Sequence, residues 1–352
     1  MWFDLGEKQS RAQYFAALNT GQGFISYFSE IFDPCERVFV IKGGSGTGKS
    51  RLMRDISARA VSEGYAVEEL LCSSDPSSLD GLIIPELSVA VLDGTAPHIH
   101  EPRLLGARDH IIDLSAFLDS EALKPRRAEI ESMTDAKARR YRQIYEYLKV
   151  IGVYDNAVYR IALRALDGEK LDKAVEKSAL YAGKSEKYEK RIRIRSAVSE
   201  NGAVTLDTYA RKADRRFAVS DACGIGGLYL KKLLAITDSR GARVEVSYAP
   251  YSPDVPDALY YPDGGSVFYI GCGEDSDERI INMRRFVDDE LLRPFKPEIR
   301  AINRLRAAVS EQVGICFSAV RRIHASIEEI YSSAMDFKAK EQLTERIIAS
   351  IF

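Results

Sequence analysis

Residues 43–50 read Gly-Gly-Ser-Gly-Thr-Gly-Lys-Ser, which matches the phosphate-binding pattern G-x-x-x-x-G-K-S/T. The apolar run at 37–41 predicts a buried strand before this loop. After the loop, apolar residues recur at helical spacing until Gly64, which predicts a helix that ends there. A strand, a glycine-rich loop and a helix in this order direct backbone N–H groups and the positive end of a helix dipole at an anion. The pattern therefore predicts an α/β fold with a nucleotide site.

The residues of this loop have distinct expected roles. Lys49 is expected to contact the β- and γ-phosphates, and Ser50 to hold Mg²⁺. An apolar run at 89–92 ends in Asp93, which suits a second carboxylate that supports Mg²⁺ through water during catalysis. The residues predicted to hold the nucleotide phosphates are Gly43, Gly44, Ser45, Gly46, Thr47, Gly48, Lys49, Ser50 and Arg51.

The group that would activate an attacking nucleophile is not part of the loop. Many ATPases place a catalytic glutamate directly after the Mg²⁺ aspartate, but Gly94 follows Asp93 here. A general base would therefore come from elsewhere in the chain. Our candidate is Glu86, with Asp80 and Glu101 as the other available carboxylates.

A threonine and two histidines follow Asp93 closely in the sequence. Either Thr95 or His98 is placed to contact the γ-phosphate or a polarised water, which makes His98 a catalytic candidate. The residues His98 and His100 alternate, so with Glu101 they loosely resemble metal ligands. Two histidines do not make a zinc site, and we expect no metal ion there.

Three further segments have a distinctive composition. The polar segment at 72–80 follows a predicted strand, at an edge where α/β proteins form ligand sites, although its Ser, Asp and Pro residues are equally typical of a turn. From 119 to 185 the pattern is helical and charged, so its arginines either close over phosphates or form a solvated helix face. The alternating basic segment at 187–195 is typical of an edge strand, and nucleic-acid contact is the less favoured interpretation.

The chain contains an internal duplication. Several short segments of the first half align in order with segments of the second half. These pairs are 39–50 with 217–228, 64–68 with 241–245, 76–85 with 253–262, 111–117 with 280–286 and 151–161 with 313–323. We therefore expect two copies of one domain, 1–190 and 191–352, with the junction between Ala182 and Arg215.

The second copy keeps the scaffold but loses the phosphate-binding groups. The substituted pairs are Lys49 with Gly227, Ser50 with Leu228 and Asp93 with Ile270. Without the lysine charge and the Mg²⁺-binding hydroxyl, a tightly held triphosphate is not expected in the second copy. We predict a tandemly duplicated α/β protein with the P-loop NTPase fold, in which a parallel sheet is flanked by helices and a helical segment follows each sheet. One copy would be functional and the other degenerate.

The composition excludes several functional classes. A chain of 352 residues is long enough for two or three domains with their own cores. A net charge of −2 argues against a protein that coats nucleic acid or anionic membranes. No apolar stretch approaches the ~18 residues of a membrane helix, and no signal peptide is visible, so we expect a cytoplasmic protein. The five cysteines are widely spaced, which is typical of reduced thiols.

Two segments beyond the loop carry a family resemblance. They are Asp-Pro-Ser-Ser-Leu-Asp-Gly-Leu-Ile-Ile-Pro-Glu-Leu at 75–87 and Leu-Asp-Gly-Thr-Ala-Pro-His at 92–98. With Asn-Thr at 19–20 and Gly-Phe at 23–24, the chain resembles an uncharacterised bacterial family of duplicated P-loop ATPases over nearly its whole length. The resemblance implies the fold and the nucleotide, but no substrate. Family members carry the loop lysine in both halves, so Gly227 argues against a two-site mechanism here.

These observations predict an ATP-binding protein that uses Mg²⁺, either a slow ATPase or a nucleotide-driven switch. The alternatives are a small-molecule or nucleotide kinase, and a non-catalytic ATP-sensing module with an unknown protein partner. An ABC transport subunit is not expected, since no Leu-Ser-Gly-Gly-type signature occurs. The second copy is expected to act as a structural or regulatory partner of the first. The arginines that it could supply in trans are Arg215, Arg216, Arg284 and Arg285.

Overall fold

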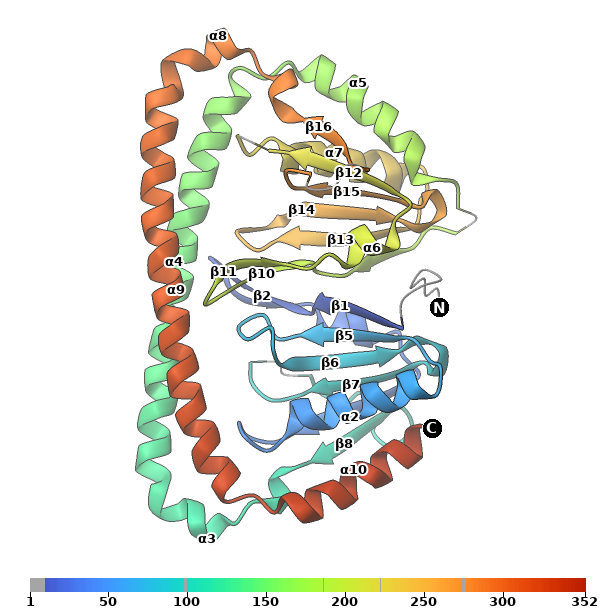
Figure 1. Ribbon diagram of the computed structural model, residues 1–352, viewed down its shortest axis with the longest axis vertical. Coiled ribbons are helices and arrows are strands. Elements are labelled where there is room, and N and C mark those ends of the chain that lie inside the picture. Colours follow the sequence, from blue (N-terminus) through green and yellow to red (C-terminus); the bar gives the residue numbers. More distant parts are fainter. Residues whose placement is uncertain (1–9, 98–99, 186, 222, 274–276) are drawn as a thin grey trace.

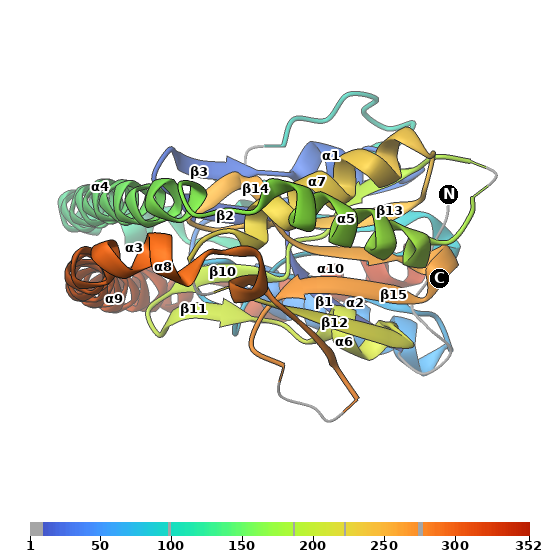
Figure 2. The ribbon, with the colours of Figure 1, turned by 90° about the horizontal axis from the view of Figure 1, so that it is seen from above.

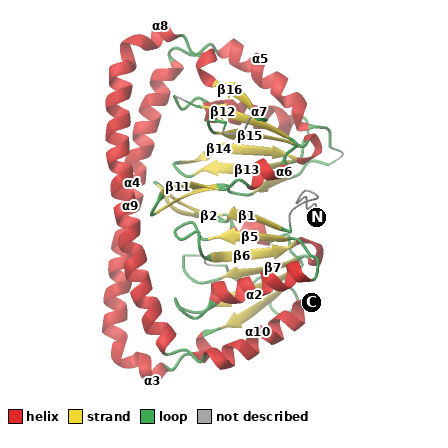
Figure 3. Cartoon of the chain, in the orientation of Figure 1, coloured by secondary structure: helices red, strands yellow, loops and turns green. Residues whose placement is uncertain are grey.

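The computed structural model describes residues 10–97, 100–185, 187–221, 223–273 and 277–352. Most of its strands gather in two six-stranded sheets flanked by helices, one in each half of the molecule, and the other described strands form two-stranded sheets (Figure 3). The elements of the first half, in chain order, are β1 (Arg11–Phe15), β2 (Ala17–Thr20), β3 (Gly23–Ser26), α1 (Phe28–Phe32), β4 (Arg37–Lys42), α2 (Lys49–Ser62), β5 (Val67–Leu71), β6 (Leu79–Ile84), β7 (Val89–Asp93), β8 (Asp109–Asp113), α3 (Ser120–Leu123) and α4 (Arg127–Leu163).

The elements of the second half of the sequence repeat this order, with one further helix before them and one after them. They are α5 (Gly168–Ser178), β9 (Lys190–Ile192), β10 (Ser196–Ser199), β11 (Gly202–Thr205), α6 (Thr208–Lys212), β12 (Arg215–Ser220), α7 (Gly226–Ser239), β13 (Val244–Ala249), β14 (Ser252–Tyr261), β15 (Ser266–Ile270), β16 (Arg279–Asn282), α8 (Asp289–Leu292), α9 (Lys296–Ser333) and α10 (Phe337–Ile351). The predicted strand at 37–41 and the predicted helix that ends before Gly64 are confirmed as β4 and α2.

The two sheets have the same topology. The first has the strand order β1-β5-β6-β7-β4-β8, and the second has the order β9-β13-β14-β15-β12-β16. The aligned segments of the two halves occupy the same positions in the two sheets, and the edge strands β1 and β9 also correspond. The duplication seen in the sequence is therefore a duplication of architecture, with two similar halves of α/β structure.

Each sheet is mixed, which corrects the expected parallel sheet. Strand β6 runs antiparallel to β5 and β7, and β14 runs antiparallel to β13 and β15, whereas the remaining neighbours are parallel. The connections on either side of β6, residues 72–78 and 85–88, are short. A parallel crossover takes about a dozen residues or more, so these connections permit only antiparallel pairing.

The long helices exchange halves. Helix α4 begins beside the first sheet, runs along α9 and ends in the second half, where α5 packs on α7 (Figure 1). Helix α9 returns in the opposite direction, and α10 packs on α2 in the first half. Figure 2 shows α4 and α9 side by side, almost end-on. The boundary expected after residue 190 thus leaves α5 and α10 on the sequence side opposite to the sheets that they cover.

The hydrophobic cores contain the exchanged helices. Ile347 and Ile351 of α10 are buried in the core of the first half. Leu171 and Val175 of α5 are buried in the core of the second half. Each core is therefore completed by a helix from the far end of a long helical connection.

The N-cap residues of α5 and α10 show which residues of the two exchanged helices correspond to each other. Asp167 caps α5 and Asp336 caps α10, and each side chain accepts a backbone N–H from the first turn of its helix. Aligning these caps places residues 151–161 opposite 320–330. The expected pairing of 151–161 with 313–323 is therefore wrong by about two helical turns. The apolar stripe of a helix repeats at that interval, so the sequence match alone does not fix the register.

The two sheets meet where the edge strand β1 lies beside the segment that follows the edge strand β9. The backbone N–H of Phe15 donates a hydrogen bond of 2.8 Å to the carbonyl of Ile194. The basic segment predicted as an edge strand forms β9, which confirms that prediction. Among the described residues, no helix is long and apolar enough to cross a membrane.

A buried charge cluster lies at this junction. Arg193 Nη2 is 2.7 Å from Glu68 Oε2, and Lys212 Nζ is 3.0 Å from Glu245 Oε2. The hydroxyl of Tyr14 lies 3.2 Å from Lys212 Nζ. All five residues are buried, so Arg193 of the basic segment pairs inside the protein and is not available to nucleic acid.

Candidate functional site

The glycine-rich loop of residues 43–48 joins β4 to α2. Gly46 and Gly48 have φ angles of +74° and +84°, a conformation that residues with a Cβ rarely adopt. Thr47 Oγ1 donates a hydrogen bond of 2.9 Å to the carbonyl of Gly44, which closes the curl. The first turn of α2 contains no acidic residue, so no side chain of that turn offsets the positive end of its dipole. The curl and the helix end together form a surface suited to an anion.

Three of the predicted residues meet at this loop. Lys49 Nζ donates hydrogen bonds to the carbonyls of Gly43 (2.9 Å) and Gly44 (2.7 Å). It also lies 3.6 Å from Asp93 Oδ2. Asp93 ends β7, the parallel neighbour of β4, and the strand register brings its carboxylate to the loop. Thr95 donates its N–H to Asp93 Oδ1 at 2.8 Å and its hydroxyl to the Gly43 carbonyl at 3.1 Å.

Ser50 lies on the first turn of α2, next to the start of β6. Its Oγ accepts the backbone N–H of Leu79 at 3.0 Å, which orients the hydroxyl. Asp80, which we expected in a polar loop, is instead buried in β6. Hydroxyl and carboxylate oxygens are ligands that Mg²⁺ prefers, so Ser50 and Asp93 fit that ion. No cluster of three or more His, Cys, Asp or Glu suited to a metal ion occurs within the described part of the chain.

Two predicted site residues lie away from the loop. Glu86 belongs to the turn Pro85–Leu87 before β7, and its Oε1 accepts the N–H of Ala66 at 3.1 Å. Ala66 directly precedes β5, so this contact lies where β5 and β7 begin. The glycine-rich loop follows the end of β4, at the opposite ends of the strands. Arg51 is exposed and pairs with Asp55 one helical turn later, at 3.0 Å. Their positions therefore do not support a base at Glu86 or a phosphate contact by the Arg51 side chain.

The histidine segment separates into unrelated environments. His98 lies outside the described residues. His100 is buried, and its Nε2 has no hydrogen-bond partner within the part of the chain that the structure describes. Burial lowers the pKa of His100, and the nearby carboxylate of Asp33 offsets this only in part. Glu101 is an exposed partner of Lys42, with an Oε1–Nζ distance of 3.8 Å.

Helix α9 covers the loop from the other half of the sequence. A Cβ atom at Gly46 would lie 2.5 Å from the carbonyl oxygen of Glu328, so the loop backbone and the helix backbone are in direct contact. His324 Nδ1 lies 3.4 Å from Ser45 Oγ and 2.9 Å from Lys137 Nζ of α4. His324 Nε2 in turn lies 3.4 Å from Glu328 Oε1. Both long helices therefore contribute side chains to the site.

Lys137 of α4 and Glu328 of α9 place charges of opposite sign beside the glycine-rich loop. Burial lowers the pKa of Lys137, and the charge of Lys49 lowers it further. The hydrogen bond from His324 lowers the pKa of Glu328, and the two lysines add to that effect. Glu328 is thus an ionised carboxylate beside a cluster of cations. The sequence around the loop gives no signal for these three helix residues, because the exchange of helices brings them there.

The counterpart loop in the second half is built differently. Asp221 Oδ1 accepts the backbone N–H groups of Cys223 (3.2 Å) and Ile225 (3.0 Å), so a carboxylate of the chain itself occupies these amides. A Cβ atom at Gly227 would lie 2.4 Å from Val255 Cγ1. A lysine at the counterpart of Lys49 therefore has no space here.

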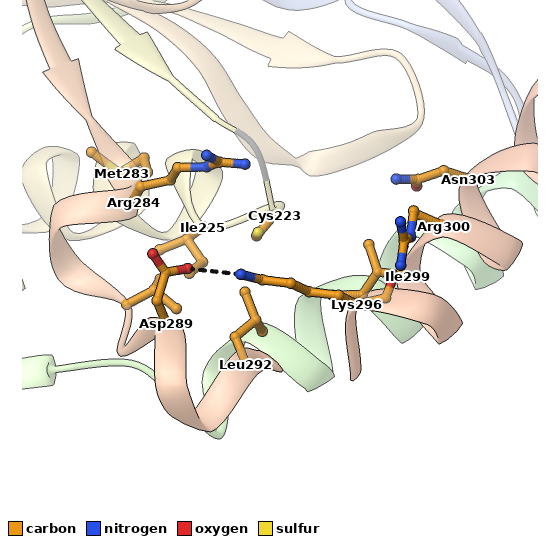
Figure 4. Close-up of a pocket in the computed structure, with 11 residues that line it drawn as sticks. Cys223, Ile225, Met283, Arg284, Asp289, Leu292, Lys296, Ile299, Arg300 and Asn303 are labelled. Carbon is orange, nitrogen blue, oxygen red and sulfur yellow. Dashed lines mark hydrogen bonds and ion pairs between the residues drawn. The ribbon is translucent and has the colours of Figure 1, made fainter. Parts of the chain in front are cut away.

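A cavity of about 320 Å³ lies beside this second loop. Figure 4 shows the side chains of Arg284, Lys296 and Arg300 around it, with Cys223 on its wall. Lys296 Nζ pairs with Asp289 Oδ1 at 3.6 Å. Basic side chains thus line a cavity at a loop where two backbone amides already have an internal acceptor.

The arginines considered as donors in trans remain in the second half. Arg284 lines the cavity, and Arg285 packs on an adjacent phenylalanine ring. The guanidinium of Arg215 lies 5.8 Å from the centre of the Tyr181 ring. Both Arg215 and Arg216 lie on β12, in the sheet opposite to the first loop (Figure 1). The second part of the sequence reaches the first loop through α9 and α10 instead.

The Gly227→Lys substitution is expected to destabilise the protein. Overlap with Val255 should cost about 1–3 kcal/mol in the free energy of unfolding. Urea unfolding measures the cost. Gly168→Lys is the matched control, because no neighbouring atom lies within 4 Å of a Cβ there. Equal stability of the two variants would contradict the packing described at Gly227.

Comparison with protein-family models, with curated proteins and with solved structures finds no match to this chain. The functional conclusion therefore depends on the geometry of the two loops and on the helices that cover them.

Proposed function

We propose that the chain binds one ATP with Mg²⁺ at residues 43–50, as a slow ATPase or a nucleotide-driven switch built on two copies of the P-loop NTPase fold. The observation that carries the proposal is the arrangement of Lys49 over the loop carbonyls, 3.6 Å from Asp93. The counterpart positions in the second half hold Gly227, Leu228 and Ile270 in place of the lysine, the serine and the aspartate. This difference supports a single site per chain.

The side chains of the loop divide the work of holding a triphosphate. Lys49 exchanges its contacts with the loop carbonyls for phosphate oxygens, which are charged and therefore stronger acceptors. Ser50 and Asp93 are the oxygen ligands for Mg²⁺, which when bound neutralises charge on the phosphates. The backbone amides of residues 43–48 hold the remaining oxygens, supported by the dipole of α2.

Glu328 is the carboxylate that we propose in place of Glu86 for orienting an attacking water. It approaches the loop from α9 and is ionised, because the hydrogen bond from His324 and the charges of Lys137 and Lys49 lower its pKa. A carboxylate in this state accepts a hydrogen bond from water and positions it. Its hydrogen bond to His324 fixes the orientation of the side chain.

The packing of α9 on the loop supports a switch function. The backbones of Gly46 and Glu328 are in direct contact, so a change in the loop displaces α9. Helix α9 packs along α4, and both helices extend into the second half. A nucleotide at the first loop is thereby coupled to the cavity at the second loop through two rigid helices.

Titration calorimetry of the full chain with ATP tests the proposal. We expect saturable binding of one ATP per chain that is tighter with Mg²⁺ than without it. Absence of binding at millimolar ATP would overturn the proposal, and two ATP per chain would contradict the single site. Phosphate release from ATP alone then identifies an ATPase, release of ADP only with an acceptor identifies a kinase, and binding without turnover identifies a sensing module.

A further inference from the structure

The exchanged helix α10 carries a lysine and a phenylalanine to the glycine-rich loop. A Cβ atom at Gly48 would lie 3.5 Å from Lys340 Cε and 3.7 Å from Lys340 Nζ. The ring of Phe337, one turn earlier in α10, would lie 3.9 Å from the same point. Both side chains therefore contact the last glycine of the loop, at the N-terminus of α2.

Lys340 is a buried residue whose amine has no hydrogen-bond or ion-pair partner among the described residues. The residue is only 3% exposed. Burial lowers its pKa, and Asp55 and Glu341 offset this only in part. An ammonium group in such a place is costly unless an anion lies beside it. The adjacent helix end favours an anion at the same place.

The second half lacks both side chains at the equivalent positions. When the caps Asp167 and Asp336 are aligned, Phe337 corresponds to Gly168 and Lys340 corresponds to Leu171. Leu171 is fully buried in the hydrophobic core. The lysine and the aromatic ring thus occur only beside the loop that retains Lys49 and Ser50.

We infer that α10 completes the nucleotide site, with the amine of Lys340 binding a phosphate group and the exposed ring of Phe337 contacting the base or ribose. Phe337 is 43% exposed although its ring lies beside the loop, which leaves an aromatic surface for a planar group. This inference depends on the proposed ATP binding at residues 43–50. It adds that the site is assembled from both ends of the sequence.

The Lys340→Met variant tests the proposed contact between the Lys340 amine and a phosphate group. Methionine fills a similar volume and removes an unpaired buried charge, so the free protein should be as stable as the wild type or more stable. Affinity for Mg²⁺-ATP should fall about tenfold or more, because a charge-assisted hydrogen bond to phosphate is lost. Lys338→Met is the matched control, since Lys338 is an exposed lysine of the same helix. Its affinity should equal that of the wild type.

Titration calorimetry with two probes separates the roles of the two side chains. Lys340→Met should weaken the binding of inorganic tripolyphosphate as well as that of ATP. Phe337→Ala should weaken the binding of ATP about threefold to tenfold and leave tripolyphosphate binding unchanged, because only ATP carries a base. Thermal unfolding of each free variant shows whether the fold is intact.

The outcomes also separate this inference from the proposed function. If the wild type binds no ATP, the proposed function fails and this inference fails with it. If the wild type binds ATP and Lys340→Met binds it equally well, the inference alone is overturned. Unchanged ATP affinity in Phe337→Ala would overturn the aromatic contact and leave the phosphate contact of Lys340 standing.

Discussion

The Lys49→Met variant is expected to lose about a hundredfold or more in affinity for Mg²⁺-ATP. Lys49 Nζ already lies within hydrogen-bond distance of two loop carbonyls, so it needs little movement to reach phosphate oxygens. Charge-assisted hydrogen bonds contribute about 1.5–3 kcal/mol each, and the loss of two of them corresponds to a factor of this size. Titration calorimetry at fixed Mg²⁺ and ionic strength measures the change.

Lys231→Met provides the control for Lys49→Met. Lys231 is an exposed lysine of α7, the helix that corresponds to α2 in the second half. Its removal changes the net charge equally but leaves the loop at residues 43–50 untouched, so ATP affinity should stay unchanged. Full ATP affinity in Lys49→Met would refute the central assignment of the site.

Truncation of Glu68 should have the largest effect on stability. The Glu68→Ala variant leaves Arg193 charged and buried without its partner at 2.7 Å, at the junction of the two sheets. Breaking one partner of a buried ion pair costs about 3–5 kcal/mol in the free energy of unfolding. Urea unfolding of the full chain measures the cost. Replacing both partners together by methionine should restore most of the lost stability, because no buried charge is then left unpaired.

An exposed ion pair provides the comparison for this effect. The pair of Arg127 and Glu131 lies on the surface of α4, and such exposed pairs contribute about 1 kcal/mol or less. Glu131→Ala should therefore change the free energy of unfolding far less than Glu68→Ala does. Equal effects of the two variants would mean that the buried cluster does not stabilise the junction between the sheets.

Local sequence patterns predicted the parts of the site that are continuous in the chain. The loop, β4, α2 and the position of Asp93 follow from residue spacing, because a strand and a helix each have a fixed period. The same reasoning failed for Glu86. Glu86 lies before β7 and Asp93 lies at its end, so the length of the strand separates them. Closeness to Asp93 in sequence therefore did not mean closeness in space.

Sequence patterns could not predict that α9 and α10 place side chains beside the glycine-rich loop. An amphipathic stripe predicts that a helix packs on something, but it does not specify the partner. His324, Glu328 and Lys340 lie far from the loop in sequence, and only the crossing of the long helices brings them to it. The duplication gave the order of the elements, yet it could not distinguish helices that return to their own sheet from helices that exchange.

The helix exchange also governs the order in which the protein is completed during synthesis. The first sheet is translated early, but Ile347 and Ile351, which close its core, are translated only after the whole second sheet. A nascent chain that includes residues 43–50 but not yet α10 therefore has neither a finished core nor the side chains of α10 beside the loop. A fragment cut between the two sheets has the same deficit, so each fragment requires the other one to complete its fold.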